Sequence, residues 1–458
     1  MSEETQAAGS ASFVSSLWTM LRGSRQGMKD AFICTIPQIV GTVTGLIGSV
    51  LIARGLGPYG LGQLALVTSL VTVTGSLSDL GLGSTTIWYT GRAVALGDVE
   101  GQFSVLRWAL RLKLSMVLCV TLCFAAAAPV VTGYVWHDKA LTGLVQLGLV
   151  GAVFTVVASI PSIYFQSVRR FGMNAMVYSA QRVVVLGGIL VLAYLQRWSV
   201  MLVIVTSLVA TGFSAVTFLW IVPKQSLWRR GEIRWGSLRK ALRSPELKRP
   251  EAGVDDTPNT FAKFLLLGTL IWIVTMQAPI WLMGFFLEKS RIGIYDAASR
   301  FTIPLVVVVG ALNTALWPRV SAVTSAEQAK VMLKRILKLS VLVAGISVFY
   351  SIAAPLLAPV VFGPAYAASV RTAQVLCIGY SIAILGAPVG VIGYSLGLVR
   401  FYWIVNLVQM VLVVCMVGFL MPQFKGSGEL VAAGAFVLSA IVWAVGTSLL
   451  VRWRMGKG

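Results

Sequence analysis

A carboxylate and a guanidinium stand four positions apart, at Asp296 and Arg300, inside an otherwise apolar stretch. At this spacing the two side chains share one face of a helix. A charge inside a membrane-spanning helix costs about 2.5–3.5 kcal/mol on insertion scales, so such charges tend to face a cavity or a partner. We therefore predict that Arg300 faces a central cavity and binds phosphate, with Asp296 orienting it or titrating. The alternative is a pair that neutralises itself or snorkels outward as a structural device.

Three further charged residues are candidates for a transport site. Arg54 ends the first apolar run, either as a surface anchor or as a cation at the mouth of the cavity. Arg182 lies about two helical turns inside a predicted span, where it either meets an anionic substrate or snorkels to the interface. Asp79 either caps a helix break or, like Asp296, couples transport to H⁺ or Na⁺. Arg182 and Arg300 are the basic residues that fall inside predicted spans.

Uncharged amides at membrane depth are the next group, with Gln38, Gln277 and Asn313 as candidates for binding sugar hydroxyls. Pro37 and Pro279 lie beside the two glutamines, at matching positions in the two halves of the chain. A proline inside a helix frees a backbone carbonyl, which suggests bendable helices that line a cavity. Taken singly, most such amides serve only as interhelical hydrogen bonds worth about 1 kcal/mol or less.

Enzyme signatures are weak. The single histidine, His137, lies beside Asp138 in a short predicted loop, and no D-x-D motif or P-loop occurs. The five cysteines show no C-x-x-C or metal-ligand spacing, so neither a disulfide framework nor a metal site is expected. We predict a transporter without a resident cofactor and without catalytic residues.

The composition explains which elements must position these residues. Of the 458 residues 57% are hydrophobic and 12% are charged, and the mean hydropathy is +0.84. A soluble domain has about 25% charged residues, so we expect an all-α polytopic membrane protein. The net charge of +21 does not indicate nucleic acid, because membrane proteins concentrate basic residues in their cytoplasmic loops.

Twelve apolar runs are long enough to span a bilayer. Their approximate ranges are 31–53, 62–88, 114–135, 143–165, 175–195, 200–222, 261–287, 292–317, 336–358, 370–397, 401–421 and 429–451. With the N-terminus inside, 28 of the 37 basic residues fall in inner segments and seven in outer ones. This bias predicts that both termini are cytoplasmic.

The chain divides at its longest polar stretch. We expect a cytoplasmic tail with an interfacial helix (1–30), a six-helix lobe (31–222), a basic cytoplasmic linker (223–260), a second six-helix lobe (261–451) and a short cytoplasmic tail (452–458). Short matches about 230 residues apart relate the two halves in order. Six helices per half give both halves the same orientation, an arrangement found in transporters with two rocking lobes.

Four segments carry a family resemblance. They are the hairpin Ile36–Tyr89 with LGPYGLGQLALV and DLGL, IYFQSVRRFGMNAM (163–176), IGIYDAASRFTIP (292–304) and VVFGPAYAAS (360–369). The chain thereby resembles the bacterial polysaccharide flippases of the MATE-like multidrug/oligosaccharidyl-lipid/polysaccharide exporter superfamily. The resemblance implies two six-helix lobes around a central cavity and export of a lipid-linked oligosaccharide across the cytoplasmic membrane. It also implies that Arg300 contacts the isoprenoid diphosphate of the cargo.

The expected partners are the lipid-linked sugar, membrane lipids and other polysaccharide-assembly proteins, without nucleic acid. One rival is a multidrug exporter of the same superfamily, which predicts carboxylates around a cavity for organic cations. A membrane polysaccharide polymerase or glycosyltransferase is a second rival, although such enzymes usually present a large outer loop or clustered acids. A non-catalytic scaffold would leave the charges inside the spans unexplained.

Overall fold

The computed structural model describes residues 25–79, 82–83, 86, 90, 99–168, 170–222, 258–310, 326–396 and 398–455. These residues form helices and turns and no strand. Most of the expected interfacial helix and of the basic linker lies outside the described residues, as does Asn313.

In the first lobe, the described residues form five long helical elements and one short π-helical turn. They are α2 (Arg25–Asp79), α4 (Val99–Val130), η1 (Val131–Val135), α5 (Leu141–Ser167), α6 (Phe171–Tyr194) and α7 (Val200–Ile221). In the second lobe, the described residues include six long or medium helices and two 3₁₀ turns, besides the short helix Ile303–Gly310. They are α10 (Pro258–Phe286), α11 (Lys289–Phe301), α13 (Ala326–Phe362), η3 (Pro364–Tyr366), α14 (Ser369–Ser395), α15 (Val399–Leu420), η4 (Lys425–Ser427) and α16 (Gly428–Met455).

Helix α2 is two helices joined at one residue. A straight helix of its 55 residues would be about 80 Å long, more than twice the hydrocarbon thickness of a bilayer. Gly57 interrupts it with φ 65° and ψ 176°, a conformation that a residue without Cβ adopts readily. Pro58 follows with a fixed φ and begins the second helix. The predicted helical hairpin therefore turns at Gly57.

Ten helices among the described residues are long and apolar enough to cross a membrane. The number becomes eleven if Lys289–Phe301 and Ile303–Gly310, which meet at 46°, form one span. Helix α2 contributes once to this number although it contains two helices. The chain is a multi-pass membrane protein, while the count of twelve spans and the cytoplasmic placement of both termini stay predictions.

One boundary prediction is wrong in a way that matters for the site. The third span was expected to begin at residue 114, whereas α4 begins at Val99. Arg107 and Lys113 therefore belong to a helix, and they are only 6% and 2% exposed. The basic residues inside helices are thus not limited to Arg182 and Arg300.

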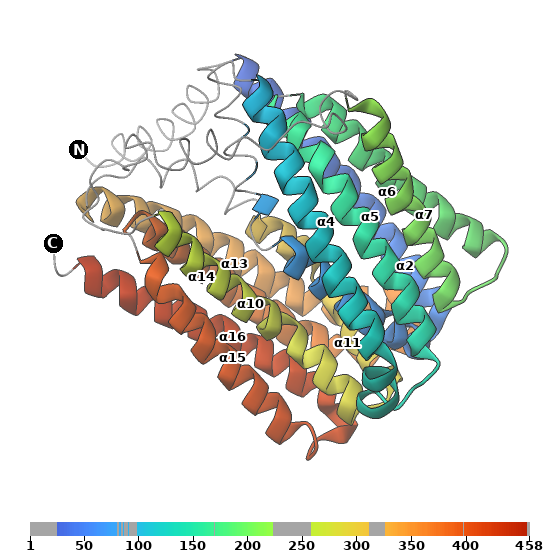
Figure 1. Ribbon diagram of the computed structural model, residues 1–458. Helices are drawn as coiled ribbons and strands as arrows, with labels where there is room; N and C mark the ends of the chain where they lie inside the picture. The colour runs from blue at the N-terminus through green and yellow to red at the C-terminus, as the bar shows by residue number, and fades with distance from the viewer. Residues whose placement is uncertain are drawn as a thin grey trace.

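The hydrophobic core shows how the two lobes are joined. One large cluster contains residues of both lobes, among them Leu61, Leu149 and Ile292, and lies toward the ends of the helices at the α2 break. Two smaller clusters lie toward the other end, and each belongs to a single lobe. Figure 1 shows the helices of both lobes converging near α11 and diverging away from it. We call these the closed end and the open end of the molecule.

Candidate functional site

At the closed end, the second half of α2 crosses α11 in backbone contact. A Cβ added to Gly62 would lie 1.8 Å from the carbonyl oxygen of Lys289. A Cβ added to Gly293 would lie 1.8 Å from the carbonyl oxygen of Pro58. Only glycine allows two helices to approach this closely, so the two glycines set the distance between the lobes.

Beside this crossing, one residue of each lobe donates hydrogen bonds to backbone carbonyls of the other lobe. Arg54 donates from Nε to the carbonyl of Val361 at 2.9 Å and from an Nη to that of Val360. These carbonyls belong to the last turn of α13, where they have no partner within the helix and where a cation is favoured. Tyr366 donates in return to the carbonyl of Ala53 at 2.7 Å. The structure thus places Arg54 as a helix cap across the lobes.

Tyr366 is fully buried in η3, outside the spanning helices. Burial raises the pKa of its hydroxyl above the ordinary value, so the group stays protonated and able to donate. Asp296 and Arg300 lie near enough to act on this hydroxyl electrostatically. The predicted phosphate site and the cross-lobe contact are therefore neighbours.

Two further contacts join the lobes. Lys289 donates to the carbonyl of Trp136 at 2.7 Å, and the Trp281 indole donates to Ser69 at 3.0 Å. The closed-end interface is defined as the residues of all these contacts. They are Ala53, Arg54, Pro58, Gly62, Ser69 and Trp136 of the first lobe, with Trp281, Lys289, Gly293, Val360, Val361 and Tyr366 of the second.

Asp296 and Arg300 pair on α11 at the spacing that the sequence indicated. Arg300 Nε donates to an Asp296 carboxylate oxygen at 2.7 Å. Each side chain is 20% exposed, so solvent reaches both. A guanidinium bound through Nε to one carboxylate oxygen keeps its other N–H groups free to bind a second anion. A phosphate could accept two of these N–H groups at once.

Asp79 has a partner that the sequence reasoning missed. Lys113 of α4 contacts its carboxylate directly and lies 3.5 Å from the hydroxyl of Ser159 on α5. Lys113 is 2% exposed and Asp79 47% exposed, so the pair joins a buried cation to an accessible anion. A Cβ on Gly83 would lie 3.2 Å from this carboxylate, which leaves little room for any other residue. The sequence signal for Lys113 was its helical spacing: the residues one and two turns away on the same face are apolar.

Among the other predicted residues that the structure describes, Arg182 and Gln277 belong to neither of these ion pairs. Arg182 is exposed, and its guanidinium lies beside Gly41 of α2. Gln277 has a buried Oε1 without a hydrogen-bond partner. Gln38 belongs to α2, although its side chain lies outside the described residues. The structure gathers Arg54, Asp296 and Arg300 near the closed end, whereas Asp79 pairs with Lys113 and Arg182 lies beside Gly41.

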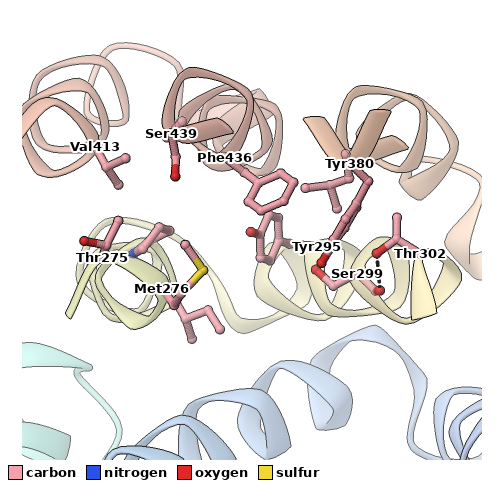
Figure 2. Close-up of a pocket in the computed structure, with 13 residues that line it drawn as sticks. Thr275, Met276, Tyr295, Ser299, Thr302, Tyr380, Val413, Phe436 and Ser439 are labelled. Carbon is pink, nitrogen blue, oxygen red and sulfur yellow. Dashed lines mark hydrogen bonds between the residues drawn. The ribbon is translucent and has the colours of Figure 1, made fainter. Parts of the chain in front are cut away.

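A cavity of about 170 Å³ lies within the second lobe, between α10, α11, α14, α15 and α16. Figure 2 shows hydroxyl and aromatic side chains pointing toward one another across it. The lining residues are Thr275, Met276, Pro279, Ile280, Tyr295, Ser299, Thr302, Leu376, Tyr380, Val413, Ala435, Phe436 and Ser439. None of them is charged. No sequence motif marks this set, because five helices contribute residues of common types.

Comparisons with known proteins agree with this architecture. A family model described as polysaccharide biosynthesis protein matches residues 28–324. A search of curated proteins finds no match. Among solved structures, an inward-facing multidrug resistance MATE family transporter of the MOP superfamily is similar, with a TM-score of 0.71 and 15% identity over 93% of this chain and 98% of the other.

Two more solved structures have the same fold. The outward-facing conformation of a multidrug resistance MATE family transporter gives a TM-score of 0.61, with 16% identity over 95% of this chain and 97% of the other. A MOP superfamily transporter from Pyrococcus furiosus, described as having a binding pocket of reverse polarity, gives 0.60 with 14% identity over 95% and 97%. At such identities the likeness shows a MATE-like transporter fold.

Proposed function

The chain belongs to the polysaccharide biosynthesis protein family, and we propose that it is a flippase for an isoprenoid diphosphate-linked oligosaccharide or polysaccharide repeat unit. A membrane exporter with a MATE-like fold is the broader function that this membership and the fold support. The lipid-linked cargo and the bacterial cytoplasmic membrane are parts of the proposal.

The observation that carries the proposal is the contrast between the two ends of the interface between the lobes. One shared core and the closed-end interface join the lobes at one end, and separate cores support each lobe at the other. Two rigid lobes joined in this way can exchange which end is closed, which is alternating access. With the predicted topology, the open end faces the cytoplasm, where the cargo would enter.

Arg300 is the residue proposed to bind the diphosphate. A diphosphate cannot cross hydrocarbon unaided, because removing charged oxygens from water is prohibitively costly. Arg300 offers a charged, partly accessible fork of donors beside the contacts that close the molecule. A cargo bound there would neutralise Arg300 in place of Asp296, and the isoprenoid tail would stay in the bilayer. Arg182, Gln38, Gln277 and Asn313 are proposed as secondary contacts for the polar part of the cargo.

The driving force is proposed to come from a coupled ion or from the membrane potential. Asp79 and Asp296 are the candidates for binding H⁺ or Na⁺, yet each already contacts a cation, Lys113 or Arg300. Ion binding at either carboxylate would therefore have to displace that partner. Moving an anion out of a negative interior releases about 2.3 kcal/mol per charge for each 100 mV, which needs no ion site.

Export of organic cations is less well supported by the charges. Among the described residues, Asp79, Asp296 and Glu429 each contact a lysine or an arginine. A cationic drug would have to compete with these partners for each carboxylate. An anionic cargo needs only to take the place of one carboxylate beside its lysine or arginine.

The test is translocation of fluorescent isoprenoid diphosphate sugars by the purified protein in liposomes. We expect Arg300→Ala to lower the rate about 10- to 100-fold, the value of one or two charged hydrogen bonds. The double variant Asp296→Ala/Arg300→Ala leaves no unpaired carboxylate. It should be equally slow, which would show that the loss of Arg300, and not an unpaired Asp296, lowers the rate. Arg197→Ala, in the exposed turn between α6 and α7, is the matched control. Wild-type rates in both Arg300 variants would remove Arg300 from the mechanism, and no translocation by the wild type would refute the proposed cargo.

A further inference from the structure

We propose that the cavity of the second lobe is a subsite for one sugar ring of the cargo, the ring next to the diphosphate. This inference rests on the proposed function, because it assumes that the cargo carries sugars. The cavity is separate from the closed-end interface and lies within a single lobe. Its volume of about 170 Å³ is below the roughly 300–1,000 Å³ of sites for drug-sized ligands, which suits a single ring and not a whole repeat unit.

The position of the cavity connects it with the phosphate site. Tyr295 and Ser299 line the cavity from α11 at i and i+4. Asp296 and Arg300 are the next residue in each case, about 100° further round the same helix. The two faces of these helical turns therefore carry an anion-binding guanidinium and an uncharged cavity side by side. A diphosphate at Arg300 would place the first sugar within reach of the cavity.

The lining has the chemistry that a sugar ring needs. A sugar has apolar C–H faces and a rim of hydroxyl groups, so it binds where aromatic rings and hydroxyls occur together. Tyr380 and Phe436 lie with ring centroids 4.8 Å apart, and Figure 2 shows Tyr295 beside them. Ser299 and Thr302 add hydroxyl groups at the same place. The absence of charge from the lining disfavours a bare phosphate or a metal ion, since neither would find a charged partner there.

Backbone features of the second lobe create this space. Pro279 removes one helical hydrogen bond in α10, and α11 bends by 46° from the segment that follows it. Gly379 of α14 allows the Phe436 ring to lie against the helix, because a Cβ at Gly379 would be 2.6 Å from a ring carbon. The shape of the cavity thus depends on a glycine, a proline and a helix bend.

The experiment measures how the translocation rate depends on the sugar. Liposomes with the full chain are supplied with polyprenyl diphosphate carrying one glucose, one galactose or one N-acetylglucosamine, and with polyprenyl diphosphate alone. We expect the wild type to prefer one sugar. Phe436→Ala should reduce this preference about tenfold and Tyr295→Phe about fivefold, the effects of one apolar contact and one hydrogen bond. Gly379→Ala should act in the same direction, because it pushes the ring into the cavity.

The preference is a ratio of rates, so a loss of folded protein lowers all rates and leaves the ratio unchanged. Phe349→Ala and Tyr194→Phe are matched controls, since these side chains are 76% and 87% exposed. They should keep the wild-type ratio. Equal rates for every cargo in the wild type, or an unchanged ratio in both Phe436→Ala and Tyr295→Phe, would overturn the subsite while leaving the flippase proposal standing. Failure of the wild type to move any of these lipids would overturn both.

Discussion

The two ends of the molecule hold their helices together by different means. At the closed end the lobes share one apolar core, and backbones touch at Gly62 and Gly293. Toward the open end each lobe has its own core, and the polar contact between Asp79 and Lys113 stays within the first lobe. The contacts at the closed end depend on the relative position of the lobes. The contacts toward the open end contribute to the folding of one lobe, whichever end is closed.

This difference predicts that substitutions at the two ends have separable effects. Closed-end changes should alter the distance between the lobes without melting them. Open-end changes should lower stability without moving the lobes. A suitable distance reporter is a pair of spin labels at Arg197→Cys and Lys425→Cys, both in exposed turns at the closed end, in a background without other cysteines.

The largest effect is expected from Gly62→Ala. Its Cβ would lie 1.8 Å from the backbone of α11, a clash that no side-chain movement relieves. We expect a cost of about 3 kcal/mol to the closed end, which shifts the lobe equilibrium about 100-fold toward separation. Longer distances between the labels with an unchanged Tm would support this.

Gly143→Ala is the matched control for that variant, because nothing lies within 4 Å of a Cβ at this position. It should keep the wild-type distance distribution. Unchanged distances in Gly62→Ala itself would show that the closed end does not depend on the glycine crossing.

Asp79→Asn should cost about 3 kcal/mol of unfolding free energy, because it leaves the buried Lys113 charge without a counter-charge and with only the Ser159 hydroxyl nearby. Lys113→Met should cost less, since the Asp79 left behind is 47% exposed and water can solvate it. The double variant should approach wild-type stability, as replacement of a whole ion pair often does. Thermal or denaturant unfolding gives all three values.

For Asp79→Asn and for Lys113→Met we expect the distance between the spin labels to stay at the wild-type value. A lobe displacement as large as that of Gly62→Ala would contradict the distinction between the two ends.

The smallest effects are expected from the two hydrogen-bonding residues of the closed end. Tyr366→Phe removes one buried hydrogen bond and should destabilise the closed end by about 1 kcal/mol. Arg54→Gln should cost no more, because Arg54 is exposed and water competes for the carbonyls. The spin-label distances should lengthen in a small fraction of molecules for each. No change in the double variant would show that these contacts are incidental.

The pH dependence of the Tyr366 contribution has a definite sign. Its pKa is raised in the closed state, so the stabilisation is fully present below the ordinary tyrosine value of about 10 and is lost only above it. The fraction of closed molecules should therefore stay constant from about pH 6 to pH 9. A titration of that fraction in this range would have to come from another group.

Local pattern alone accounts for much of this protein. Apolar runs predict membrane helices, the short break between the runs 31–53 and 62–88 predicts the hairpin, and the i, i+4 spacing predicts the pair of Asp296 and Arg300. These features depend on neighbours in the chain, so periodicity and backbone freedom are sufficient to indicate them.

Only the tertiary structure decided which distant groups meet. Arg54 caps carbonyls more than 300 residues away, and Lys113 reaches Asp79 from another helix. The cavity in the second lobe needs five helices to form it. Periodicity defines the face of a helix on which a residue lies, but it does not specify which helix will cover that face. Packing makes that choice, because it depends on the shapes of all the helices at once.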